Sequence, residues 1–124
     1  MRCHCLAARR RARELTRAFE AKLRPHGLRA TQFSVLVALA AAGPKPVGAL
    51  ARALGVERTT LTRGAGVLER NGWITVRESQ DGRERLLSLT ASGRRKLEQA
   101  YPAWKSAQDA AEKTIANDSR ASKR

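Results

Sequence analysis

Three side chains that can bind metals, Cys3, His4 and Cys5, stand together near the start of the sequence. Cysteine thiolates and histidine imidazoles are ligands for zinc and copper. A thiol among arginines also loses its proton more readily, because positive charge stabilises the thiolate, and thiolates are easily oxidised. The group therefore suggests either metal binding or redox chemistry.

Metal binding is the less favoured of these two hypotheses. A structural zinc site needs four ligands, adjacent residues rarely reach one ion together, and the one other histidine is His26. We predict no metal site and no cofactor. Cys3 and Cys5 stay candidate redox residues, beside the alternative that they have no such role, and no structural disulfide is expected in the cytoplasm.

Other catalytic chemistry finds no support in the sequence. It contains no phosphate-binding glycine loop, no carboxylate pair at a suitable spacing and no nucleophile with a base nearby in sequence. We therefore predict that the protein is not an enzyme.

The charge of the chain indicates a partner instead. Its 25 Lys and Arg residues against 11 Asp and Glu give a net charge of +14, which attracts polyanions. Charge alone leaves DNA, RNA, a membrane surface and simple solubility open. Because we find neither a membrane-spanning run nor a secretion signal, we expect a cytoplasmic, nucleoid-associated protein without a membrane partner.

A helix-turn-helix is predicted over residues 46–71. Apolar residues recur at helical spacing on both sides of Gly55, first from Val47 to Leu54 and then at Leu61, Ala65 and Leu68. Two short helices joined by a glycine turn are typical of this motif, whose second helix enters the major groove of DNA.

The polar residues at the start of that second helix lie off its apolar stripe. They could form an ordinary solvated face, but their place in the motif favours contact with DNA. The candidates are Arg58, Thr59, Thr60, Thr62 and Arg63.

A β-hairpin is predicted next, over residues 73–89. Two β-prone segments, Trp73 to Arg77 and Arg85 to Leu89, flank Asp81-Gly82, a strong hairpin signal. A basic hairpin that follows a recognition helix is a wing, and Arg83 could reach a phosphate or the minor groove. Arg85 is a second candidate DNA contact, with the alternative that both arginines only discourage edge pairing. Asp81 is expected to orient Arg83 or to cap the turn.

Long helices are predicted at both ends of the chain, over residues 5–24 and 90–116, with a largely buried helix between Thr31 and Gly43. The last helix has an apolar stripe with coiled-coil spacing, and such a stripe is usually buried against another helix. Residues 117–124 are polar and are expected to fray. The fold class is thus mainly α with a small β-hairpin (α+β), in one domain over residues 1–116.

Taken together, these segments resemble the multiple-antibiotic-resistance regulator (MarR) family of bacterial transcription factors. The similarity runs from about Leu6 to Ile115. Its most telling parts are Val47-Gly-Ala-Leu-Ala-Arg-Ala-Leu-Gly-Val56, Glu57-Arg-Thr-Thr-Leu-Thr-Arg63, Leu68-Glu-Arg-Asn-Gly72, Asp81-Gly-Arg83 and Leu89-Thr-Ala-Ser-Gly93.

The resemblance implies a winged helix-turn-helix homodimer on a pseudo-palindromic operator, with the terminal helices forming the dimer interface. Many relatives are repressors released by small ligands or oxidants. Three departures stand out: Gly64 and Gly66 lie inside the recognition helix, the wing turn that carries Arg83 is slightly shorter than the family often shows, and relatives commonly carry a further C-terminal helix.

We therefore predict a sequence-specific regulator of transcription that binds double-stranded DNA, a repressor controlled by a small-molecule effector or an oxidant. The alternative is a non-specific basic protein associated with the nucleoid or with RNA.

Overall fold

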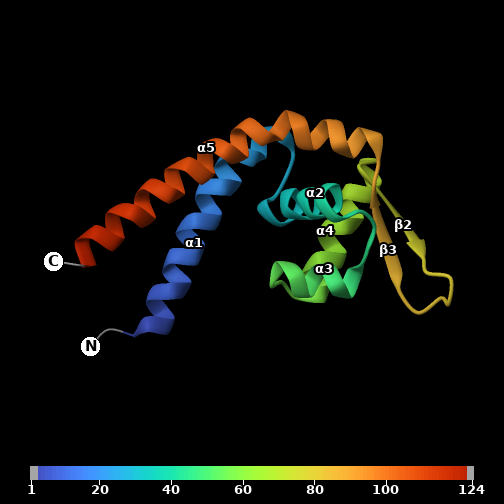
Figure 1. Ribbon diagram of the computed structural model, residues 1–124, viewed down its shortest axis with the longest axis horizontal. Coiled ribbons are helices and arrows are strands. Elements are labelled where there is room, and N and C mark those ends of the chain that lie inside the picture. Colours follow the sequence, from blue (N-terminus) through green and yellow to red (C-terminus); the bar gives the residue numbers. More distant parts are fainter. Residues whose placement is uncertain (1–2, 123–124) are drawn as a thin grey trace. The chain divides into compact units, whose positions relative to one another are not determined.

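The computed structural model describes residues 3–122 and is mainly helical with one small sheet, as predicted (Figure 1). In chain order its elements are α1 (His4–Leu23), the short 3-10 helix η1 (Arg24–His26), α2 (Ala30–Ala42), β1 (Lys45–Pro46), α3 (Val47–Leu54), α4 (Arg58–Arg70), β2 (Ile74–Glu78), β3 (Arg85–Leu89) and α5 (Ala91–Ser122).

The contacts of the chain group it into two compact units. One unit comprises the chain up to Ala30 together with the chain from Ala100 onward, and the other comprises Thr31–Gln99. That both belong to one domain over residues 1–116 stays a prediction.

Helices α2, α3 and α4 supply most of the core of the Thr31–Gln99 unit. The predicted inward residues of α4, Leu61, Ala65 and Leu68, are all buried, as expected from their spacing on one helix face. Helix α3 ends at Gly55, whose φ of 66° places it in the left-handed region that glycine adopts at little cost. This turn joins α3 to α4 and completes the predicted helix-turn-helix.

The sheet is antiparallel and has the strand order β1-β3-β2. In the hairpin, Ile74 pairs with Leu89 and Glu78 with Arg85. Strand β3 has the predicted bounds, and β2 begins one residue later than the predicted segment. Strand β1 was not predicted; its two residues pair with Leu86 and Leu87 and tie the start of α3 to the wing.

Two close contacts attach α5 to the turn that follows α4. The Thr90 hydroxyl donates to the Gly72 carbonyl at 2.7 Å and accepts from the Gly93 backbone N–H at 2.9 Å. Thr90 therefore caps the first turn of α5. At Gly93 a side chain has no room, because a Cβ there would lie 2.0 Å from the Trp73 carbonyl oxygen.

The other unit contains α1 and the second half of α5. Leu23 is the buried residue of α1, and its remaining side chains are exposed or half-buried. Arg11 of α1 forms an ion pair with Asp118 of α5.

Helix α5 extends to Ser122, beyond its predicted end at residue 116, and the fraying of the polar tail stays a prediction. Helix α5 continues through Asn117 because no Gly or Pro ends it there, although Asn117, Asp118 and Ser119 are weaker helix formers than alanine. The last two residues of the predicted tail lie outside the described residues.

Candidate DNA-binding site

The five candidate residues at the start of α4 are all exposed in the chain. They are Arg58, Thr59, Thr60, Thr62 and Arg63. Glu57 precedes the helix as its N-cap, so the first turn of α4 is formed by three of these candidates. Side chains in the first turns of this helix can meet base edges in a helix-turn-helix, and their exposure leaves them free to do so.

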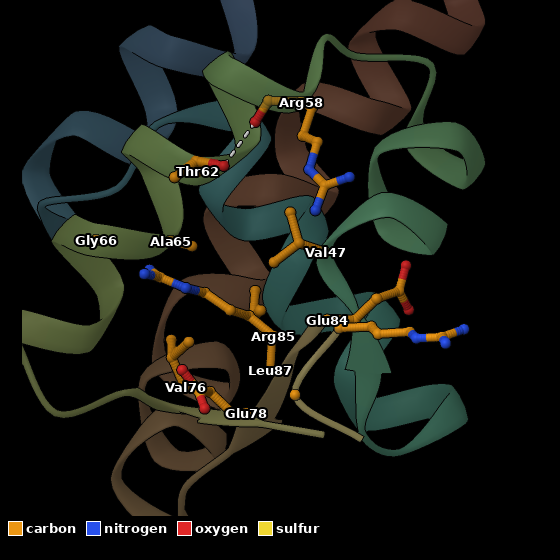
Figure 2. A pocket seen from close by; sticks show the side chains of 12 residues that line it. Val47, Arg58, Thr62, Ala65, Gly66, Val76, Glu78, Glu84, Arg85 and Leu87 are labelled. Atoms are coloured by element: carbon orange, nitrogen blue, oxygen red, sulfur yellow. Dashed lines mark hydrogen bonds between the residues drawn. The ribbon is translucent and has the colours of Figure 1, made fainter. Parts of the chain in front are cut away.

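Thr62 uses its hydroxyl proton within the helix. Its Oγ1 donates to the Arg58 carbonyl at 2.8 Å (Figure 2). The hydroxyl oxygen keeps its acceptor capacity and the methyl group stays available for apolar contact. As long as this bond is kept, Thr62 can accept a hydrogen bond from a base amino group or touch a thymine methyl, but it cannot donate.

A groove of about 420 Å³ lies between the start of α3, helix α4 and the wing. Figure 2 shows Arg58 and Thr62 on the α4 side and Arg85 and Glu84 on the wing side. The residues that line the groove are Val47, Arg58, Thr62, Ala65, Gly66, Val76, Glu78, Gly82, Arg83, Glu84, Arg85 and Leu87.

The structure thus brings together only part of the predicted set. Arg58 and Thr62 share the groove with Arg83 and Arg85 of the wing. The other three candidates, Thr59, Thr60 and Arg63, do not line it. The predicted residues therefore form two adjoining surfaces, the exposed start of α4 and an arginine-lined groove beside it.

Hydrogen bonds around Asp81 organise the wing loop. Its Oδ1 accepts from the Ser79 hydroxyl at 2.6 Å and from the Arg83 backbone N–H at 3.2 Å. These bonds, the Ser79 one first, lower the pKa of Asp81 below its usual 3.8, because both stabilise the carboxylate. Asp81 therefore holds the backbone of Arg83 directly, and its role in aiming that side chain at DNA stays a prediction.

The two glycines of α4 face different surroundings. A Cβ at Gly64 would lie 3.6 Å from Cγ of Gln32 on α2, and a Cβ at Gly66 would lie 3.7 Å from the Arg70 guanidinium. Both are ordinary contacts, so neither glycine is required by packing. Gly66 instead forms part of the groove wall, where the missing side chain leaves the groove wider.

The cysteines lie at the start of α1. Cys3 precedes the helix as its N-cap without capping it through its side chain, Cys5 lies in the first turn, and both thiols are free and exposed. Within residues 3–122, no three or more His, Cys, Asp or Glu side chains are placed so that they could hold a metal ion. No helix in this part of the chain is long and apolar enough to cross a membrane.

Comparison with known proteins identifies the family. The MarR family model matches residues 26–84, which include the helix-turn-helix and most of the wing. The transcriptional regulator MosR of Mycobacterium tuberculosis, solved in complex with DNA, is 37% identical, with a TM-score of 0.77 over 98% of this chain and 97% of that one. The chain belongs to the MarR family.

Two further relatives extend this result. The HTH-type transcriptional regulator YwoH of Bacillus subtilis is 38% identical over 71% of this chain, although the match spans only 64% of YwoH. The structure of reduced AbfR bound to DNA is 28% identical and has a TM-score of 0.74, with 82% of this chain and 72% of that one covered. The predicted MarR resemblance and the winged-helix fold are thereby confirmed.

Three charged residues of this MarR-family chain were missed by sequence reasoning. Glu78 and Glu84 line the groove although acidic side chains repel DNA, and the Arg52 guanidinium of α3 lies near Glu84 and Arg58 above Gly48. Helical periodicity marks Arg52 only as an exposed residue. Its proximity to the wing depends on how β1 joins α3 to β3, and no sequence pattern indicates β1.

Proposed function

We propose that this chain is a sequence-specific regulator of transcription that binds double-stranded DNA. The observation that carries the proposal is the exposed polar start of α4 next to a groove in which Arg58 and Thr62 meet the wing arginines. The relatives MosR and AbfR, both solved with DNA, support it.

The exposed start of α4 and the arginine-lined groove have different roles in DNA binding. Arginines contact phosphates of any sequence, so Arg58, Arg83 and Arg85 supply affinity. The exposed first turns of α4 supply discrimination, since Arg63 can bind guanine through two hydrogen bonds and threonine can contact either base edges or thymine methyl groups.

A second copy of the chain is the proposed partner in the complex. In the single chain α1 leaves almost its whole length uncovered, with Leu6 64% exposed, although helices in proteins are stabilised mainly by packing of an apolar face. Helices α1 and α5 together line an apolar groove of about 420 Å³. Its lining includes Leu15 and Ala18 of α1 and Ala111 and Ile115 of α5. The same faces of a second copy can cover these residues, and a symmetric dimer of this kind fits a pseudo-palindromic operator.

Control of binding by an oxidant is the proposed regulation, in keeping with AbfR, which has been solved on DNA in reduced and in overoxidised form. Cys3 and Cys5 are the exposed thiols that a peroxide can reach. Two thiols and one hydrogen peroxide give a disulfide and two molecules of water, which changes the start of α1. Repression, released by such a change or by a small-molecule effector, is the proposed outcome.

We further infer that the protein works in the cytoplasm on nucleoid DNA and has no catalytic activity. The runner-up, a non-specific basic protein of the nucleoid or of RNA, uses the same groove for phosphates but does not need Arg63.

Substitution of Arg63 tests the proposal. We expect Arg63→Ala to reduce the ratio of the affinities for a selected site and a random duplex by about fivefold to 150-fold, because a good bidentate contact is worth about 1–3 kcal/mol of discrimination. Arg95→Ala removes the same charge from α5, where no base contact is proposed, and should leave the ratio unchanged. An unaltered ratio in Arg63→Ala would show that this residue does not read the site.

A further inference from the structure

Three charged side chains from three elements converge above Gly48 of α3. A Cβ on Gly48 would lie 3.6 Å from Nη1 of Arg52, 3.7 Å from Nη1 of Arg58 and 3.7 Å from Oε1 of Glu84. Arg52 belongs to α3, Arg58 opens α4, and Glu84 closes the wing loop. The Glu84 carboxylate therefore lies within about 7 Å of both guanidinium nitrogens, although within residues 3–122 of the single chain it forms an ion pair with neither arginine.

The wing loop fixes the backbone of Glu84. Its carbonyl accepts from the Ser79 N–H at 2.7 Å, and its own N–H donates to the Ser79 hydroxyl at 3.2 Å. Glu84 is half-buried, whereas Arg52 and Arg58 are exposed and carry long, flexible side chains. Figure 2 shows Arg58 extending toward Val47, with the Glu84 carboxylate also near the start of α3. A carboxylate on a hydrogen-bonded backbone thus lies close to two exposed guanidinium groups.

We propose that Glu84 is an internal counterion for Arg52 and Arg58, which a DNA phosphate has to replace, so that Glu84 restrains the binding of any duplex. A carboxylate and a phosphate are bound by the same guanidinium N–H groups, and the two anions therefore compete. The inference rests on the proposed binding of DNA and adds a residue that opposes it.

The substitution Glu84→Gln removes the charge while keeping the size of the side chain. If it frees the arginines for one additional phosphate contact, the slope of log affinity against log salt steepens by about 0.9, which corresponds to roughly eightfold tighter binding at about 0.1 M monovalent salt. The gain should be equal for selected and random duplexes, because phosphates carry no sequence information.

Glu78→Gln is the matched control. Glu78 is an exposed carboxylate of the same hairpin and lines the same groove, but it is not among the three atoms nearest to Gly48. The change in duplex affinity of Glu78→Gln measures the general effect of removing one negative charge from the wing. A second arm repeats Glu84→Gln in a background that carries Arg52→Ala and Arg58→Ala, where no guanidinium is left to be freed.

The experiment measures duplex binding by fluorescence anisotropy over a series of salt concentrations, with thermal unfolding as a check on the fold. We expect Glu84→Gln to gain clearly more affinity than Glu78→Gln and to lose this excess in the double-alanine background. An equal gain for both variants, a gain that persists without the arginines, or weaker binding by a destabilised Glu84→Gln would each overturn the inference. If the wild-type chain binds no duplex at all, the proposed function itself fails.

Discussion

Gly93→Ala should destabilise the Thr31–Gln99 unit, because α5 begins directly against the turn after α4. The added Cβ would lie 2.0 Å from the Trp73 carbonyl oxygen and 2.8 Å from Cδ1 of Leu89. The first turn of α5 must therefore withdraw by on the order of 1 Å to restore an ordinary contact. This movement strains two hydrogen bonds, from the Thr90 N–H to Trp73 and from the Thr90 hydroxyl to Gly72.

The size of the effect follows from these contacts. Overpacking costs about 1–3 kcal/mol, and each weakened hydrogen bond costs up to about 1 kcal/mol. The better helix propensity of alanine offsets less than about 1 kcal/mol of this destabilisation. A net loss of about 3 kcal/mol lowers the Tm by on the order of 10 °C for a chain of this size.

Thermal and urea unfolding monitored by circular dichroism measure this loss, and Gly66→Ala is its control. At Gly66 the nearest atom to an added Cβ is the flexible Arg70 guanidinium at 3.7 Å, so the same substitution should stabilise by up to about 1 kcal/mol. A Gly93→Ala Tm within about 2 °C of the wild type, or equal losses at both glycines, would refute the proposed close packing of α5.

Three further predictions concern the wing, the dimer and the cysteines. Arg83→Ala should weaken binding to selected and random duplexes alike and reduce the salt slope by about 0.9 in anisotropy titrations, and an unchanged slope would exclude a phosphate contact. Ile115→Glu should convert the dimer to a monomer in sedimentation velocity, whereas Ser106→Glu, which places the same charge on α5 outside the apolar groove, should not; a dimer that survives Ile115→Glu would place the interface elsewhere. Hydrogen peroxide should lower the DNA affinity of the wild type but not of the variant with serine at Cys3 and Cys5, and equal sensitivity of both proteins would remove these thiols from the proposed regulation.

Local sequence signals predicted the DNA-binding elements closely. The apolar spacing of Leu61, Ala65 and Leu68 identified the buried face of α4, and Asp81-Gly82 placed the hairpin, because both signals depend on neighbours in sequence. The glycine at position 55 marked the turn between α3 and α4 for the same reason.

Features that depend on tertiary contacts could not be predicted from the sequence. Strand β1 is only Lys45 and Pro46, too short for any alternation, and exists because it pairs with β3. The convergence of Arg52 and Glu84 follows from that pairing and could not be inferred from charge patterns. Helix α5 continues to Ser122, beyond its predicted end at residue 116, because polar residues alone do not end a helix and no Gly or Pro follows Pro102 in it.

The most direct test of the central claim is the affinity of the wild-type chain for a duplex selected from genomic DNA, compared with a random duplex of equal length across salt concentrations. We expect the selected site to be bound at least about a thousandfold more tightly, as specific regulators bind their sites, and we expect both affinities to fall as salt rises. A ratio near one at every salt concentration would contradict sequence-specific regulation and favour a non-specific nucleic-acid-binding protein.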